Sequence, residues 1–413
     1  MLSAYEQMQA GDWSGAKTTL DKAKAKYPDA EGLWALYAAI AVFRKDYAEA
    51  VADFKKELAA HPELPEIVLA LAAAEGENGD QAEAGHTLQT YLDKHPGDLR
   101  LSLALAQMQN TAQDYESARK TLETAARQNP EDRAVRVRLS ETLLRLNRKD
   151  EAAAVAKSAL DGTDDTGVLN DAGYVLAETG LDLPYAEEVS RKSIEVLEAK
   201  TAAITPAEVN SNAFAQSRLL IAAWDTLGWV LFREGKLDQA EPLIISGWRN
   251  ALVPEAGDHL GQVYEAMGKK ENAISAYRLA AASIEGGNVS PDVRDHITKS
   301  IARLGGASTT VSRDNGTQAL QETRTYHIAR PDGVSGWGTF RLQLSTTGVI
   351  ASQQMSGDEK LAAIAGKINA LKFPELVPPG SAAHLLRSAV VSCSKGSNCD
   401  VVLVPNSSLQ TEQ

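Results

Sequence analysis

Cysteine is nearly absent from this chain, since only Cys393 and Cys399 occur among its 413 residues. Two cysteines exclude a disulfide-rich scaffold and a zinc site made of cysteines alone. No apolar run approaches the roughly 20 residues of a membrane-spanning helix, and residues 1–13 lack the basic and apolar regions of a secretory signal. As written, the sequence predicts a cytoplasmic protein without membrane insertion. We expect a periplasmic location if the chain is a fragment of a longer precursor.

Basic side chains are also fewer than acidic ones. The chain has 42 basic and 55 acidic side chains, a net charge of −13. Residues 309–413 hold 9 of the basic and 8 of the acidic ones, which leaves 33 and 47 for the preceding residues. A net-acidic surface repels phosphate, so we expect neither nucleic acid nor an anionic membrane as the partner.

Catalytic signatures are missing as well. The chain has no Walker A loop, no His-Glu-x-x-His, no Cys-x-x-Cys and no Gly-x-Ser-x-Gly. Its seven histidines are scattered singly. The sequence therefore predicts a protein that is not an enzyme and has no cofactor or metal.

What the chain does have is an internal repeat. Three series recur every 34 residues: Pro28, Pro62, Pro96 and Pro130; Ala16, Ala50, Ala84 and Ala118; and Leu20, Phe54, Leu88 and Leu122. Proline cannot continue a helix, and a small alanine lets two helices cross closely. Between these signals stand Gly-Asp or Lys-Asp pairs that end one helix and cap the next. The period predicts stacked pairs of antiparallel helices.

The later repeats show the same pattern most clearly. One contains Trp224, Leu227, Gly228, Leu231, Gly235 and Ala240, and the next contains Leu260, Gly261, Tyr264, Gly268, Ala273, Tyr277 and Ala280. This pattern resembles the tetratricopeptide-repeat (TPR) family and implies an α-solenoid of about eight repeats over residues 1–306. A polar insertion, Thr201 to Ser217, is expected to form a loop or a lengthened helix end. Glu57 departs from the alanine of the family, so we expect looser packing there.

In the TPR family the first helix of each repeat lines a concave groove that binds a peptide or protein partner. The resemblance implies that this chain is a non-catalytic scaffold for such a partner, and it leaves the oligomeric state open. The residues it places in the groove as binding candidates are Phe43, Gln107, Asn110, Arg145, Trp229, Phe232 and Arg233, with Asp225 among the further groove positions. An alternative is that Trp229 and Phe232 simply pack against neighbouring helices.

The pattern changes after the solenoid. Residues 307–318 are rich in Ser, Thr, Gly and Asn and predict a linker. Residues 319–413 then predict a small α+β domain of order β-β-α-β-β, with strands near 338–344, 349–355, 386–392 and 400–404 and a helix over 358–371. This domain resembles the module that closes TPR arrays in bacterial envelope proteins, and distantly TonB-like C-terminal domains. The resemblance implies an alternative function, the non-catalytic C-terminal portion of a larger envelope enzyme with an upstream transglutaminase-like domain.

Cys393 and Cys399 flank a five-residue turn of the last predicted hairpin. Facing positions at a hairpin end satisfy disulfide geometry. Reduced structural thiols, or a metal site with His384 nearby, are the alternatives.

Overall fold

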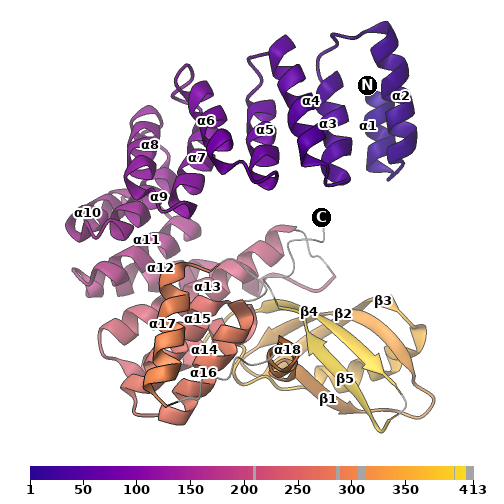
Figure 1. The fold of residues 1–413 in the computed structure, drawn as a ribbon. Helices are drawn as coiled ribbons and strands as arrows, with labels where there is room; N and C mark the ends of the chain where they lie inside the picture. Colours follow the sequence, from indigo (N-terminus) through magenta and orange to yellow (C-terminus); the bar gives the residue numbers. More distant parts are fainter. Residues whose placement is uncertain (208–210, 285–288, 306–312, 395, 406–413) are drawn as a thin grey trace. The chain divides into compact units, whose positions relative to one another are not determined.

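Paired helices form the larger part of the molecule in this computed structural model, which describes residues 1–207, 211–284, 289–305, 313–394 and 396–405. The chain divides into two units, Met1–Ser158 and Ala159–Gln413. The helices of the first unit follow one another as antiparallel neighbours (Figure 1). They are α1 (Leu2–Gln9), α2 (Trp13–Lys26), α3 (Leu33–Phe43), α4 (Tyr47–Ala60), α5 (Pro65–Glu77), α6 (Gln81–Leu92), α7 (Leu99–Thr111), α8 (Tyr115–Gln128) and α9 (Arg133–Arg145), with α10 (Lys149–Leu160) continuing into the second unit.

The 34-residue series occupy the predicted places in these pairs. The four alanines are fully buried, and so are Leu20, Leu88 and Leu122, with Phe54 6% exposed. Each of the four prolines follows the end of a second helix. Asp12, Asp46 and Asp114 cap the second helices, their carboxylates accepting hydrogen bonds from the backbone amides of Gly15, Glu49 and Ser117. The repeat period thus predicts the core and the turns of this unit.

The expectation of loose packing at Glu57 is wrong. Glu57 of α4 is fully buried. Its carboxylate accepts hydrogen bonds from the amides of Gly32, Trp34 and Ala35, at 2.6, 2.9 and 3.2 Å. These amides form the N-terminus of α3, whose own N-cap residue, Gly32, supplies no side chain. Glu57 therefore joins the two helices instead of loosening them.

In the second unit the helix pairs continue and are followed by a sheet. Its helices are α11 (Thr166–Thr179), α12 (Leu183–Ala202), α13 (Ser211–Arg233), α14 (Leu237–Ala251), α15 (Pro254–Ala266), α16 (Lys270–Ser283), α17 (Pro291–Arg303) and α18 (Arg313–Glu322). Gly261 shows why the pairs are close: a Cβ there would lie 2.3 Å from the Tyr277 ring of the next helix. In chain order α1 to α16 make up eight consecutive helix pairs among the described residues, in line with the predicted number of about eight.

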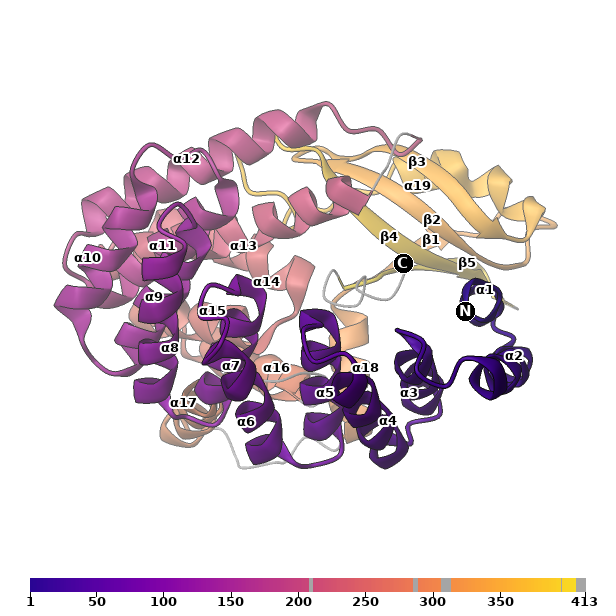
Figure 2. The ribbon, with the colours of Figure 1, turned by 90° about the horizontal axis from the view of Figure 1, so that it is seen from above.

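The sheet contains five antiparallel strands in the order β1-β5-β4-β2-β3. They are β1 (Thr325–Ala329), β2 (Gly336–Ser345), β3 (Gly348–Gly357), β4 (Leu385–Cys393) and β5 (Asn398–Leu403). The α+β class is confirmed, but β1 was not predicted. The predicted helix over 358–371 is a 3₁₀ helix, η2 (Glu359–Ile364), followed by the short α19 (Ala365–Asn369). Figure 2 shows α19 beside the sheet, and it contacts β1 and β3.

The sheet shares one hydrophobic core with the helices of its unit. Leu197 of α12 and Leu220, Ile221 and Trp224 of α13 pack in the same cluster as the strands. The connection between α12 and α13, part of the predicted insertion, also contacts β2, since the Arg341 guanidinium donates to the Pro206 carbonyl at 2.9 Å. The predicted boundary at residue 306 therefore does not separate two cores. Of the predicted linker, residues 307–312 lie outside the described part of the chain, and 313–318 begin α18.

Candidate functional site

Four of the predicted groove residues lie in the first unit, each on the first helix of a repeat. Phe43 ends α3, Gln107 and Asn110 lie on α7, and Arg145 ends α9. The Phe43 ring is 56% exposed and stacks on Trp13, with 3.9 Å between ring centroids. Gln107 and Arg145 are also exposed.

Asn110 is partly buried and joins two repeats. Its Nδ2 donates to the hydroxyl of Thr142 on α9 at 3.1 Å. The four residues of this unit are thus spread over three first helices and do not gather into one cluster.

The other three residues gather tightly in the second unit. Trp229 Nε1 donates to Oε1 of Glu178 on α11 at 2.5 Å, and Nη1 of Arg233 lies 3.4 Å from the same oxygen. The Trp229 ring stacks on Phe232, at 4.9 Å, and on His259 of α15, at 4.1 Å. Helices α11, α13 and α15, all first helices, therefore meet at Trp229.

Trp229 is 6% exposed, so it does not offer an open binding site for a partner's side chain. The packing alternative describes this indole better, because neighbouring helices cover it. Phe232 and Arg233 remain half-buried. Of these three side chains, Phe232 and Arg233 are therefore the ones that a partner can contact.

His259 and its carboxylate partners complete the cluster. His259 Nδ1 lies 2.9 Å from Oδ2 of Asp225, and His296 Nδ1 on α17 lies 2.7 Å from Oδ1 of Asp258. The Tyr174 ring of α11 lies 6.2 Å from the His259 ring. We call this surface the α11–α15 patch. It consists of Asn170, Asp171, Tyr174, Glu178, Asp225, Trp229, Phe232, Arg233, Glu255, Asp258 and His259.

Three groups of the patch have raised pKa values. Burial opposes protonation of His259, but the nearby carboxylates, Asp225 first, outweigh burial and raise its pKa. Burial raises the pKa of Asp258, and the hydrogen bond from His296 offsets part of this rise. Burial also raises the pKa of Glu255. Folding therefore shifts all three groups toward protonation relative to the unfolded chain.

We expect a pH dependence from His259. Because its folded pKa lies above its unfolded value of 6.5, its contribution to stability is complete below pH 6.5 and is lost as the pH rises through the folded pKa. The raised pKa values of Asp258 and Glu255 act in the same direction. Urea unfolding between pH 6 and 8.5 should show stability falling with pH, by at most about 1.4 kcal/mol per pH unit for one proton.

The matched comparison is His259→Gln, which cannot titrate. Its unfolding free energy should depend less on pH than that of the wild type over the same range. Parallel pH profiles for the two proteins would contradict this role of His259.

Sequence reasoning missed Glu178 and His259. The signal for Glu178 was present, because Asn170, Tyr174 and Glu178 recur every four residues and so share one face of α11. His259 lies one 34-residue period after its partner Asp225, so the two occupy equivalent positions of adjacent repeats, but the period does not indicate that they pair. For metal binding, the described ranges contain no group of three or more His, Cys, Asp or Glu side chains that could hold an ion.

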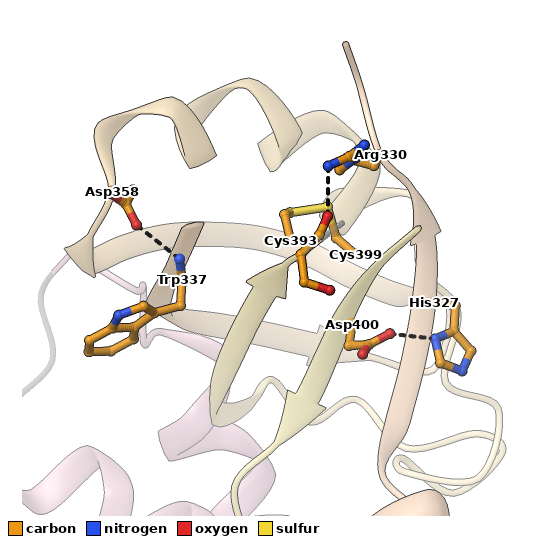
Figure 3. The surroundings of a disulfide bond; sticks show 8 residues. His327, Arg330, Trp337, Asp358, Cys393, Cys399 and Asp400 are labelled. Carbon is orange, nitrogen blue, oxygen red and sulfur yellow. Dashed lines mark hydrogen bonds and ion pairs between the residues drawn. A yellow bond between two sulfur atoms is a disulfide. The ribbon is translucent and has the colours of Figure 1, made fainter. Parts of the chain in front are cut away.

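The cysteine pair lies far from the patch in sequence, at the end of the β4–β5 hairpin. Cys393 and Cys399 are joined by a disulfide and are both buried. Figure 3 shows the bond next to Arg330, whose guanidinium donates to the Ser394 carbonyl at 2.6 Å. The Trp337 side chain in the same view is 60% exposed. The disulfide closes the turn of the β4–β5 hairpin, so neither cysteine is available as a thiolate ligand for a metal.

Comparison with known protein families supports the interpretation of the helix pairs as repeats. Tetratricopeptide-repeat models match residues 1–65, 110–167 and 258–283. With the 34-residue period and the eight helix pairs, these matches identify the helical part as a TPR solenoid. Such repeats typically bind proteins and are generally non-catalytic. None of these matches covers residues 319–413, so the resemblance of that domain to TonB-like modules stays a prediction.

Similar folds occur among solved structures. A tetratricopeptide repeat protein from Parabacteroides merdae is 15% identical, with a TM-score of 0.48 over 64% of this chain and 96% of the other. Yeast Tom70 is 17% identical, with a TM-score of 0.44 over 76% of this chain and 62% of Tom70. We found no match among curated protein sequences. Across the described residues, no helix is both long enough and apolar enough to cross a membrane.

Proposed function

We propose that this chain is a non-catalytic scaffold that binds a peptide or protein partner along the inner faces of its first helices. The observation that carries the proposal is the contrast between two sets of side chains in the repeats of the first unit. The alanine series and the leucine or phenylalanine series of the 34-residue period are buried, whereas Phe43, Gln107 and Arg145 on the first helices are exposed. Exposed aromatic, amide and guanidinium groups on three of the first helices offer a partner both apolar contact and hydrogen bonds.

Site-specific photo-crosslinking tests this proposal. A benzophenone amino acid placed at Gln107 or at Phe232 should crosslink to the partner in the cells from which the protein comes. The matched controls are exposed Lys120 on α8 and Glu271 on α16, which lie on second helices. Crosslinks that form equally from the first and second helices would contradict binding along the inner faces.

Substitutions give an independent measurement once a partner has been captured. Arg233→Glu replaces the ion pair with Glu178 by two like charges at the proposed binding surface and should weaken capture by about tenfold, because their repulsion displaces the side chains there. Phe43→Ala removes an exposed aromatic surface and should also weaken capture. Full affinity in both variants would count against this binding surface.

A further inference from the structure

Exposed apolar side chains gather on α1 and α3, the first helices of the first two repeats. Within the described residues of the first unit, five large apolar side chains are exposed, and four of them lie on these two helices. They are Leu2 (72%), Tyr5 (51%), Val42 (39%) and Phe43 (56%), whereas the fifth, Tyr27, follows α2. Single exposed apolar residues are ordinary, but such a group marks an interaction surface.

The 34-residue period places these side chains at equivalent positions of the two helices. Leu2 of α1 corresponds to Leu36 of α3, and Met8 corresponds to Val42. Leu2, Tyr5 and Met8 are three residues apart, so they form a stripe along one face of α1, and α3 carries the matching stripe. Figure 2 shows α1, α3 and α5 on the inner side of the arc that the first unit forms, with α2, α4 and α6 outside.

Packing joins the two stripes into one surface. Met8, Trp13 and Leu36 are partly buried against the same hydrophobic cluster. The Phe43 ring of α3 stacks on Trp13, which begins α2 directly after the turn from α1. We call this surface the α1–α3 patch, and it consists of Leu2, Tyr5, Met8, Leu36, Val42 and Phe43.

The patch differs in charge from the later repeats. None of the 11 residues of α3 is acidic or basic. The position of Phe43 holds Thr111 in α7 and Arg145 in α9, so the inner face becomes polar and then charged along the unit. A charged group of a partner would lose hydration on the patch without gaining a counter-charge. The segment that covers the patch is therefore apolar on the side that touches it.

Hydrogen-bonding groups are as scarce on the patch as charges. Among its six side chains only Tyr5 has a hydrogen-bond donor. An extended segment on this surface would leave backbone amides and carbonyls without partners, which costs free energy. A helix satisfies these groups internally, and its side chains pack between the ridges of two neighbouring helices. The chemistry of the patch therefore favours a helix over an extended peptide.

We propose that the α1–α3 patch binds the apolar face of an amphipathic helix of the protein partner. This inference rests on the proposed scaffold function and adds the conformation and the chemistry of the segment that is bound. The helix lies along α1 and α3, with its apolar side chains against Tyr5, Val42 and Phe43. Polar parts of the partner then fall on α7 and α9, where the inner positions are polar.

The test uses the full chain and three labelled peptides of leucine, alanine and glutamine with equal numbers of lysine and glutamate. The first carries its leucines at i, i+3, i+4 and i+7, the second has the same composition with alternating leucines, and the third is the first with two central prolines. Fluorescence anisotropy should show the first peptide binding at least about tenfold tighter than the other two, with little effect of salt. Equal affinity for the first two peptides would overturn the proposal.

Variants locate the binding of the first peptide. Tyr5→Glu and Val42→Glu place a charge in the patch and should each weaken binding about tenfold. Tyr27→Glu is the matched control, because Tyr27 is an exposed aromatic residue outside the patch, and it should leave the affinity unchanged. Wild-type affinity in both patch variants would overturn the proposal. Tyr5→Glu keeps the test valid if Val42→Glu lowers stability, since Tyr5 is the more exposed of the two.

Two other occupants are tested with the same proteins. Sedimentation equilibrium should show the same mass for the wild type and Val42→Glu, and neutral phosphatidylcholine vesicles should bind neither the wild type nor Tyr5→Glu. A dimer that Val42→Glu dissociates would assign the patch to a second copy of the chain. Vesicle binding that Tyr5→Glu abolishes would assign it to a lipid surface. Either result would overturn the proposal.

The two proposals fail in different ways. If crosslinks form from Gln107 and Phe232 but the first peptide binds no better than the second, the preference for a helix is wrong and the scaffold function stands. If the first peptide binds through Tyr5 and Val42 but crosslinks form equally from second helices, the patch is a helix-binding site and binding along the inner faces is wrong.

Discussion

Replacing Arg387 by methionine should lower the unfolding free energy of the second unit by about 3 to 5 kcal/mol. Arg387 lies on β4 and is 1% exposed. Its guanidinium donates to the side chain and, at 3.2 Å, to the carbonyl of Asn250 in the last turn of α14, and to the Val404 carbonyl at 2.6 Å. Methionine fills a similar volume but has no donors, so these buried acceptors lose their partner.

The charge of Arg387 also suits its position. Burial lowers the pKa of Arg387 to about 10, so the side chain stays protonated at neutral pH. A cation at the C-terminal end of a helix is stabilised by the helix dipole. Asn250 in turn donates to the Leu376 carbonyl at 2.7 Å, which ties α14 to the segment before β4. Losing Arg387 therefore weakens the junction between the helices and the sheet.

Arg249→Met is the matched control for this junction. Arg249 also joins α14 to the C-terminal domain, because its Nε lies 2.8 Å from the Glu375 carboxylate. This ion pair is partly exposed. Such pairs contribute about 1 kcal/mol or less, so the control should unfold near the wild-type urea concentration. Similar losses of stability in Arg249→Met and Arg387→Met would show that the buried hydrogen bonds of Arg387 stabilise the junction no more than the exposed ion pair does.

The repeat core was predictable because it depends on local sequence. Each buried alanine and each capping aspartate acts within its own helix pair, so a 34-residue period reveals them. Arg387 and Asn250 are 137 residues apart, and no period or motif links them. The strand β1 was missed for a similar reason, since it is short and gains its place by pairing with the distant β5. The shared core of sheet and helices is likewise made of long-range contacts.

The candidate site was predictable only in part. The resemblance to TPR repeats selected Trp229, Phe232 and Arg233, which the structure brings together. The resemblance did not indicate that Glu178 and His259 would cover Trp229, because these residues lie 51 and 30 positions away from Trp229 in the sequence. Whether any of these residues binds a partner stays a prediction that the crosslinking experiment decides.

Glu57→Ala should lower stability by about 2 to 4 kcal/mol, although alanine is the residue that the TPR pattern carries at this position. The family pattern alone predicts that this change tightens the packing of α4. The structure predicts the reverse sign, because the buried carboxylate holds three backbone amides at the N-terminus of α3. An anionic acceptor there is also favoured by the helix dipole.

Urea unfolding followed by circular dichroism measures the sign, and amide hydrogen exchange locates the effect. In Glu57→Ala the amides of Gly32, Trp34 and Ala35 should exchange faster than in the wild type. Glu57→Gln keeps an acceptor without the charge and should lose about half as much stability. Glu49→Gln on the same helix is the control, because Glu49 is exposed and pairs with exposed Arg44. A Glu57→Ala protein as stable as the wild type would mean that helix packing, and not the buried carboxylate, joins α3 to α4.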